Sequence, residues 1–225
     1  MCGRFTKMYT WAELHALYSL SPGLENARSN LQPRYNICPT TEIDIIRARN
    51  NRPEILAARW GLIPSWWKKP LKELPATFNA RAETVHQKPM FRAAFKSRRC
   101  IVPASGYYEW RKGEDGGREP HYFRRVDGAV ISMAGLCEEW TDPSSGEIVT
   151  STTIIVCDAS GEVAHIHNRM PVILEQNQIE KWLTGKSGVE VLKPAPEGTL
   201  QEHRVSRRVN SSRADENDET LIEPE

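Results

Sequence analysis

The second residue of the chain is a cysteine, and its position offers chemistry that no internal residue has. Removal of Met1 would leave Cys2 as the amino terminus, with a thiol and a free α-amine on neighbouring carbons. An α-amine has a pKa of about 7.7–8.0, so much more of it is neutral and nucleophilic at pH 7 than of a lysine amine. The thiol could attack an acyl group, or the amine could condense with an aldehyde before the thiol closes a thiazolidine ring. The alternative is a small residue in a frayed terminus.

Glu109 and His167 are the candidates for moving protons. Glu109 stands between two aromatic residues in a strand-like run, and a carboxyl group in apolar surroundings has a raised pKa. The alternative is that strand alternation turns Glu109 to solvent. His167 could shuttle protons near neutral pH or serve as a hydrogen-bonded structural histidine. His165 would face the same side of an extended segment, but only His121 is an obvious third ligand, so we predict no metal site.

Two further segments suggest a binding surface. Asn79 could position a backbone or substrate group, and Arg81 could hold a phosphate with two parallel hydrogen bonds. Trp66 and Trp67 are followed by two lysines, an arrangement typical of base stacking beside a phosphate contact. The loop around Pro39 adds another aromatic and proline surface. An ordinary polar loop and a buried aromatic plug are the alternatives for these segments.

The residue pattern predicts elements that would position these groups. Thr10 and Glu13 have capping-box spacing, which indicates a helix that ends before residue 21. Further helices are expected at 90–96 and 179–183, and strands are expected at 43–48, 54–60, 100–104, 107–112, 120–126, 129–137 and 149–157. The short turns between the later strands favour antiparallel pairing. We therefore expect an α+β fold: a single domain over residues 1–210, of curved, mainly antiparallel β-sheets that are barrel-like, with a few flanking helices. The acidic residues 211–225 are expected to form a disordered tail.

Composition narrows the class of protein. The 225 residues suit one well-buried domain or at most two small ones, and no window of eighteen residues is apolar throughout. Arg4 and Lys7 interrupt any apolar segment near residue 1, so we expect no secretory signal. The five cysteines are odd in number and lack a CxxC pair, which argues against disulfides or a zinc finger and favours a reducing compartment. Residues 1–110 carry a balance of +9 and residues 111–225 a balance of −8. The basic first half could supply phosphate contacts, or the asymmetry could be only an uneven solvated surface.

The order of the motifs is more specific than any one of them. The blocks are Cys2-Gly3-Arg4-Phe5, Arg34-Tyr35-Asn36-Ile37-Cys38-Pro39, Trp60-Gly61-Leu62-Ile63-Pro64 with Trp66-Trp67, Asn79-Ala80-Arg81-Ala82-Glu83-Thr84, Gly106-Tyr107-Tyr108-Glu109-Trp110, Ile166-His167-Asn168-Arg169-Met170-Pro171 and Val205-Ser206-Arg207. In this order they resemble the SOS-response-associated peptidase (SRAP) family, the abasic-site processing proteins. The resemblance covers residue 2 to about residue 210. One departure is Thr40, where many relatives have a glycine after the proline.

The resemblance implies that Cys2, once Met1 is removed by self-cleavage or by an aminopeptidase, forms a stable thiazolidine with the ring-opened aldehyde of an abasic site in single-stranded DNA. It implies that Asn79 positions the terminus, that Glu109 assists proton transfer, and that His167 acts in ring opening. The expected DNA contacts are backbone contacts by Arg4, Arg81 and Arg169, and stacking at a single-strand to duplex junction by Pro39, Trp67 and the adjoining Trp66. No role is assigned to His165.

Two other functions remain open from the sequence. One is an amino-terminal-nucleophile amidohydrolase or peptidase, in which Asn79 would serve an oxyanion hole. The other is a noncovalent sensor of single-strand junctions, in which Cys2 is incidental. We expect an enzyme with no cofactor, no metal and no membrane partner, acting as a monomer. The expected compartment is the cytoplasm, with the nucleoid, in a bacterium and the nucleus in a eukaryote.

Overall fold

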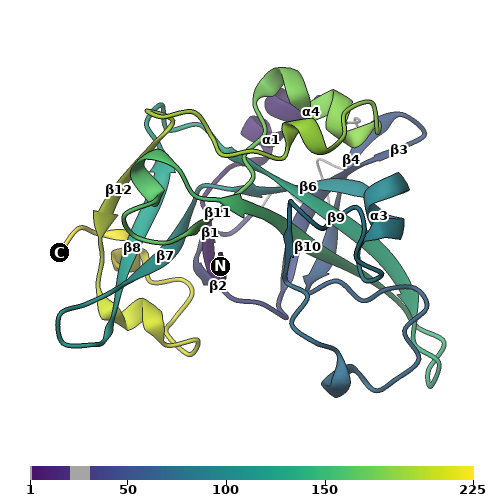
Figure 1. Ribbon diagram of the computed structural model, residues 1–225, viewed down its shortest axis with the longest axis horizontal. Helices are drawn as coiled ribbons and strands as arrows, with labels where there is room; N and C mark the ends of the chain where they lie inside the picture. The colour runs from purple at the N-terminus through teal and green to yellow at the C-terminus, as the bar shows by residue number, and fades with distance from the viewer. Residues whose placement is uncertain (1, 21–30) are drawn as a thin grey trace.

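A closed barrel of five strands forms the centre of the computed structural model, which describes residues 2–20 and 31–225 (Figure 1). In order around the barrel the strands are β10 (Ile148–Asp158), β4 (Arg52–Trp60), β3 (Glu42–Arg49), β6 (Arg99–Ala104) and β9 (Ile131–Thr141). β9 pairs again with β10 over seven residue pairs, and this pairing closes the ring. A closed ring leaves none of these strands as an open edge.

A second sheet of five antiparallel strands packs beside the barrel. Its order is β12 (Leu200–Arg204), β8 (Arg118–Arg125), β7 (Gly106–Lys112), β1 (Phe5–Lys7) and β2 (Arg34–Ile37). Two short strands, β5 (Asn79–Arg81) and β11 (Arg169–Pro171), pair with β10 at the barrel. The expected α+β, barrel-like fold is confirmed. The pairing is mainly antiparallel, and among the described strands the parallel pairs are those of β10 with β4 and with β5.

Local sequence explains the elements that we expected. The turn between β3 and β4 places Asn50 and Asn51 at φ values of 52° and 59°, and such a two-residue left-handed turn matches the twist of the strands it joins. Asparagine tolerates this conformation better than most residues because its short side chain bonds locally. Thr10 accepts a hydrogen bond from the Glu13 amide and Glu13 reaches back, so the predicted capping box of helix α1 (Trp11–Tyr18) is confirmed.

The remaining helices lie on the outside of the sheets (Figure 1). They are α3 (Arg92–Ser97), α4 (Gln176–Leu183) and the 3₁₀ turns η1 (Leu71–Glu73), η2 (Gly161–Val163), η3 (Val189–Val191), η4 (Arg207–Asn210) and η5 (Glu219–Ile222). α4 packs on β6 through the buried Trp182, whose indole nitrogen donates to the Cys100 carbonyl at 2.9 Å. Within the described ranges, every helix is too short or too polar to cross a membrane.

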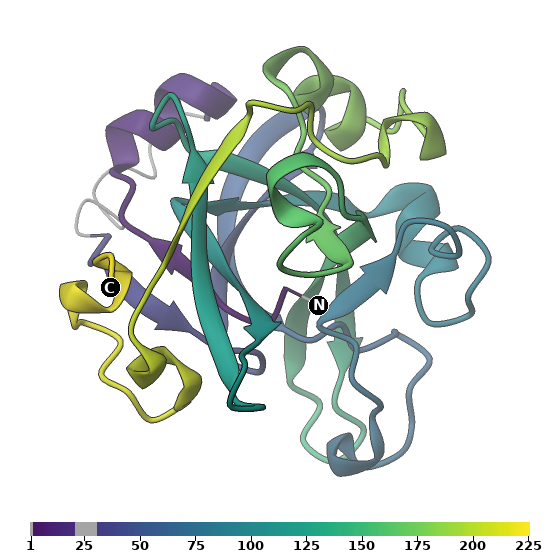
Figure 2. The ribbon, with the colours of Figure 1, turned by 60° about the vertical axis from the view of Figure 1, so that its left-hand side comes forward.

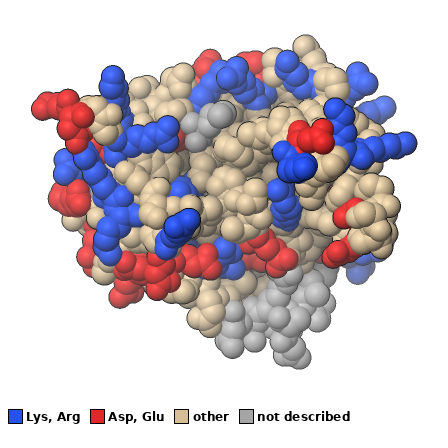
Figure 3. Space-filling view, turned by 90° about the horizontal axis from the view of Figure 1, so that it is seen from below, with Lys and Arg blue, Asp and Glu red and all other residues tan. Residues whose placement is uncertain are grey.

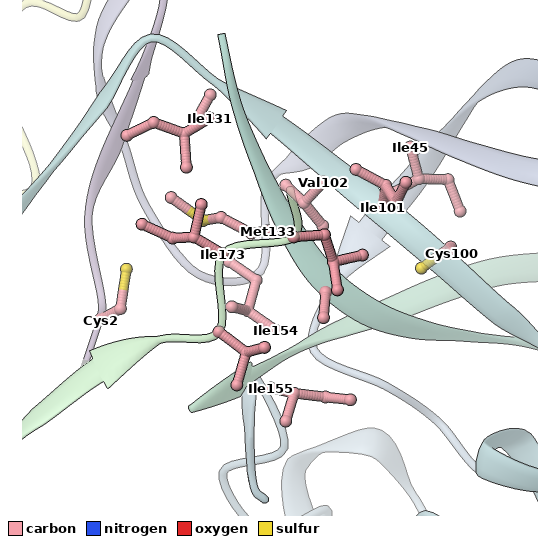
Figure 4. Close-up of a cluster of buried hydrophobic side chains, with 14 of the residues drawn as sticks. Cys2, Ile45, Cys100, Ile101, Val102, Ile131, Met133, Ile154, Ile155 and Ile173 are labelled. Carbon is pink, nitrogen blue, oxygen red and sulfur yellow. The ribbon is translucent and has the colours of Figure 1, made fainter. Parts of the chain in front are cut away.

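The main hydrophobic core fills the barrel and continues toward β1. It includes Cys100, Cys137 and Cys157, which are buried and unpaired, as expected of small apolar residues. Figure 4 shows Cys2 at the edge of a cluster that also contains Ile154 and Ile173. The first side chain of the candidate site is therefore part of the core.

The carboxyl-terminal segment corrects one expectation. Residues 211–225 were expected to be disordered, but Leu221 is fully buried in a second cluster that contains Tyr108 and Val209. The Tyr35 amide donates to the Glu216 carbonyl at 2.6 Å, and the Glu216 side chain pairs with an arginine of β2. The acidic composition of this segment suggested disorder. In the structure its acidic residues pair with arginines elsewhere in the protein, and a few apolar residues such as Leu221 pack into the second cluster.

Candidate active site

Strand β1 brings the head of the chain to the junction of the two sheets. Phe5 is opposite Ile37 of β2 and Tyr107 of β7, so β1 is held on both sides. In Figure 2 this purple strand leads to the centre of the view, where the second sheet meets the barrel. Cys2 has no exposed surface. A frayed terminus, the alternative for this residue, is therefore wrong.

Asn79 fixes the backbone of Cys2. The Asn79 amide nitrogen donates to the Cys2 carbonyl oxygen at 2.7 Å. β5 holds Asn79 in place by parallel pairing with β10, where Asn79 is opposite Ile154. The side-chain oxygen of Asn79 is buried and has no hydrogen-bond partner among residues 2–20 and 31–225. It is therefore available to a group that binds beside Cys2.

Glu109 is a buried acid on β7. Only 1% of its surface is exposed, so the alternative that it faces solvent is wrong. Burial raises the pKa of this carboxyl group to about 7 because the low-dielectric surroundings penalise its charged form. At neutral pH it can therefore both give and accept a proton.

His167 lies beside Glu109, with 3.8 Å between its Nδ1 atom and a carboxylate oxygen. The same Nδ1 atom can accept from the Arg169 amide at 3.0 Å in one tautomer or donate to the Arg169 carbonyl at 3.2 Å in the other. Burial lowers the pKa of His167, because a buried imidazolium loses its hydration. The ring is therefore neutral at pH 7 and carries one ring proton.

The Cys2 thiol is held in its protonated form. Burial raises its pKa far above the ordinary range, and the charge of Glu109 raises it further. A thiol of this kind is a poor source of thiolate at neutral pH. In this environment an amine at the same residue is the better first nucleophile.

A cleft of about 1010 Å³ opens at Glu109 and His167. Gly3, Arg4, Glu109 and His167 contribute to its lining, and so do basic residues of the β7–β8 hairpin: Arg111, Lys112 and Arg118. On the face in Figure 3, Lys and Arg side chains stand on both sides of a largely uncharged hollow. Our sequence analysis missed the hairpin residues. The signal for them was three basic residues that flank a glycine-rich turn directly after the Glu109 motif.

Comparison with known proteins gives the family. A family model described as SOS response associated peptidase (SRAP) matches residues 1–212. The chain belongs to this family. It is 32% identical over 228 residues to "Abasic site processing protein YoqW" of Bacillus subtilis, covering 99% of both chains, and 30% identical to "Abasic site processing protein YedK" of Escherichia coli, covering 94% and 95%. A crystal structure of a protein from Bacteroides thetaiotaomicron superposes over 100% of both chains with a TM-score of 0.88 and 27% identity.

Two of the three arginines that we expected to contact DNA have partners within the protein. The Arg4 guanidinium donates to the Asn36 side chain at 2.6 Å and to the Val209 carbonyl at 2.5 Å. Arg169 pairs with Glu83 at 2.5 Å and with an aspartate on β10 at 3.2 Å. Arg81 is exposed on β5, two residues after Asn79. Arg81 is therefore the best placed of the three for a phosphate contact.

The tryptophan segment divides into an exposed and a partly buried ring. Trp66 is 51% exposed, which contradicts a buried aromatic plug at this position. Trp67 is half-buried, and its carbonyl accepts a hydrogen bond from the Trp140 indole at 2.7 Å. Pro39 lines the cleft. A flat ring is thus available to a nucleobase at Trp66, while Trp67 fixes the loop.

The histidines outside the cleft have other partners. His165 lies 3.6 Å from Glu202, and His121 lies 2.7 Å from the other oxygen of the same carboxylate. In the part of the chain that the structure describes, no cluster of three or more histidine, cysteine, aspartate or glutamate side chains is arranged to hold a metal ion.

Proposed function

We propose that this protein processes abasic sites in single-stranded DNA by forming a thiazolidine between mature Cys2 and the sugar aldehyde. The relatives named for abasic site processing support the substrate class, because two of them align over at least 94% of the chain. The observation that carries the mechanism is the bond from Asn79 to the Cys2 carbonyl at 2.7 Å, beside the buried acid Glu109. This hydrogen bond holds the Cys2 backbone at a position where Glu109 can transfer protons to and from it.

The chemistry requires one loss of water. Removal of Met1 frees the Cys2 amine, which adds to the aldehyde carbon and gives a carbinolamine. Glu109 in its protonated form donates to the departing hydroxyl group, and its carboxylate then takes the proton from nitrogen, so that water and a neutral imine result. The protonated thiol then adds across the C=N bond, so that sulfur bonds to carbon and its proton moves to nitrogen. The high pKa of the thiol suits this order, because the thiol acts only after the imine has formed.

His167 and Glu109 divide the proton transfers. The abasic sugar is closed for most of the time, and opening it requires a proton on the ring oxygen. His167 is neutral, so it can pass a proton to the ring oxygen only while its other nitrogen takes one up. Protonated Glu109, with a carboxylate oxygen 3.8 Å from Nδ1, can supply that proton in the same step. Two titratable groups in different environments can thus supply the acid and the base at one pH.

The cleft supports a single strand as the substrate. Its basic hairpin and the exposed Arg81 suit a phosphate backbone, and the exposed Trp66 suits stacking with a base next to a junction. A site without its base leaves room for the protein terminus to reach the sugar, and it has no stacked base to displace.

A denaturing gel tests the proposal. Protein whose loss of Met1 is verified by mass spectrometry is incubated with a single-stranded oligonucleotide that carries one abasic site. We expect a slow band that survives heating in detergent, no band for Cys2→Ala, and an unchanged band for the control Cys38→Ala, which removes a half-buried thiol. Cys2→Ser keeps the amine but lacks the thiol, so it should give a band only after borohydride reduction of the imine.

Three results would contradict the proposal. A band that persists in Cys2→Ala would place the bond at another residue. Salt-sensitive binding without any band would support the noncovalent junction sensor. Ammonia release from glutamine, or peptide cleavage, without a band would support acyl chemistry instead.

A further inference from the structure

A row of acidic and basic side chains crosses the second sheet behind the cleft. Glu109 of β7 is directly opposite His121 of β8 in the antiparallel register. Residues opposite each other in such a pair project from the same face, with Cβ atoms about 4.5–5.5 Å apart. His121 is 5% exposed, so both side chains of this pair are buried. A buried acid and a buried imidazole are therefore neighbours on one face of the sheet.

Glu202 of β12 holds the imidazole from the other side. Its carboxylate lies 2.7 Å from Nδ1 of His121, which places a proton on Nδ1. The other nitrogen, Nε2, is buried and has no hydrogen-bond partner among the described residues. A carboxylate that fixes one tautomer and stabilises the imidazolium makes the second nitrogen a competent base.

His165 connects the row to solvent. Its Nε2 atom lies 3.6 Å from the second oxygen of Glu202, and its side chain is 56% exposed. His165 stands two residues before His167, which contacts Glu109. One segment of the chain thus contacts the row at both ends, and the row runs from the buried acid to the surface.

The other charged groups near His121 have partners of their own. Arg204 of β12 is opposite His121, but its guanidinium pairs with Glu225 at 3.1 Å. Glu119, two residues before His121 on β8, pairs with Arg111 at 3.0 Å. Among the titratable groups on the strands that flank β8, Glu202 contacts the imidazole, and Glu109 is its neighbour in the register on the other side.

We propose that His121, held by Glu202, is a positioning residue that exchanges the proton of Glu109 with solvent. A proton that leaves Glu109 moves to Nε2 of His121, and the Nδ1 proton passes through Glu202 to His165 and water. In total one proton moves from Glu109 to solvent. When a proton returns from solvent along the same path, all four side chains regain their original protonation states. The inference deepens the proposed function, since it rests on Glu109 as the acid of that reaction.

The pH profile of crosslinking tests this relay. His121→Gln and Glu202→Gln remove the base and its carboxylate, so Glu109 should ionise only at higher pH. Because Glu109 acts in its protonated form, the fall of the rate at high pH should move about one pH unit higher. We expect both variants to match the wild-type rate at pH 5.5 and to exceed it by up to about tenfold at pH 8.5. His203→Gln is the matched control: His203 lies on β12, but its Nε2 atom donates to the Ile222 carbonyl at 2.7 Å, away from the row, and the pH profile of this variant should be unchanged.

A second measurement separates this inference from the proposed function. Carbon-13 NMR of labelled glutamate follows the titration of Glu109 without any DNA. The Glu109 pKa should rise in both variants and stay unchanged in His203→Gln. An unmoved Glu109 titration, or a loss of rate that is equal at every pH, would overturn the relay even if the wild type crosslinks. If the wild type forms no crosslink but the titration moves, the proposed function fails and the coupling of the three residues stands.

Discussion

At the scale of single residues, Glu109 shows what the fold does to an ordinary carboxyl group. Burial between the sheets raises its pKa to about 7, whereas a glutamate in an unfolded chain titrates at about 4.3. Between these pH values the folded protein binds a proton that the unfolded chain has released. The free energy of unfolding must therefore fall as the pH rises from about 4 to about 7, since the ionised group is buried.

The fall of the free energy of unfolding with rising pH gives a prediction that can be tested without DNA. Glu109→Gln removes the charge, so it should stabilise the protein at pH 8 relative to pH 5, by up to about 3 kcal/mol from the size of the shift. Urea denaturation of both proteins at the two pH values measures the difference. Glu114→Gln, at an exposed position on the β7–β8 turn, should show no such dependence. An equal effect of Glu109→Gln at both pH values would contradict the buried, protonated acid.

Asn79 supports a second prediction at this scale. Asn79→Ala removes the donor to the Cys2 carbonyl, and the loss of one such bond costs about 1–1.5 kcal/mol. If that energy positions the reacting terminus, crosslinking should slow about tenfold while the affinity for DNA stays within twofold. Single-turnover gels and anisotropy measure the two quantities. Equal losses of affinity and rate would instead mark Asn79 as a DNA contact.

At the scale of elements, the sequence predicted the long strands and missed the short ones. The β3–β4 hairpin and the barrel strands β6, β9 and β10 have enough alternation and clear turns to be recognised. β1, β5 and β11 are three residues each, too short for any periodicity, and β5 and β11 form only because β10 offers them a partner.

The short strands that the sequence did not predict carry Asn79, Arg81 and Arg169. The positions of these site residues could therefore not be predicted either. Residue chemistry singled out Cys2, Glu109 and His167, but it could not show that they meet, because their contacts join three distant parts of the chain. The pairing register of β7 with β8 places His121 beside Glu109, and Glu202 of β12 contacts His121. A pairing register between distant strands cannot be read from a local sequence pattern.

The carboxyl-terminal segment gives a prediction for an element. Leu221 is fully buried against the cluster that includes Val209, whose carbonyl accepts from Arg4. Leu221→Ala should cost about 2–4 kcal/mol, because truncation of a buried leucine leaves a cavity. Limited proteolysis should then cut between residues 207 and 225 before it cuts the barrel. The control Leu71→Ala, at an exposed position, should change stability by less than about 0.5 kcal/mol. Leu221→Ala with wild-type stability would show that the segment does not contribute to the fold.

At the scale of the whole molecule, the net charge of +1 is too small to attract DNA by itself. We therefore expect individual basic side chains to determine the affinity for DNA. Arg81→Ala should weaken binding to single-stranded DNA and reduce the slope of log K against log salt by about 0.7, the value for one phosphate contact. Arg52→Ala makes the same change of charge at the β3–β4 turn, away from the cleft, and should leave the slope unaltered. Equal slopes for wild type and Arg81→Ala would remove Arg81 from the backbone contacts.

The contact between Arg4 and Val209 joins residues 205 positions apart, and this has a consequence for biosynthesis. Residues around Cys2 are translated before Val209, so part of the pocket that encloses Cys2 is made later. At about 5–20 residues per second, the intervening 205 positions take about ten seconds or more. If Met1 is removed within that time, as the proposed function allows, the Cys2 amine and thiol are open to small aldehydes in the cell until the later segment docks.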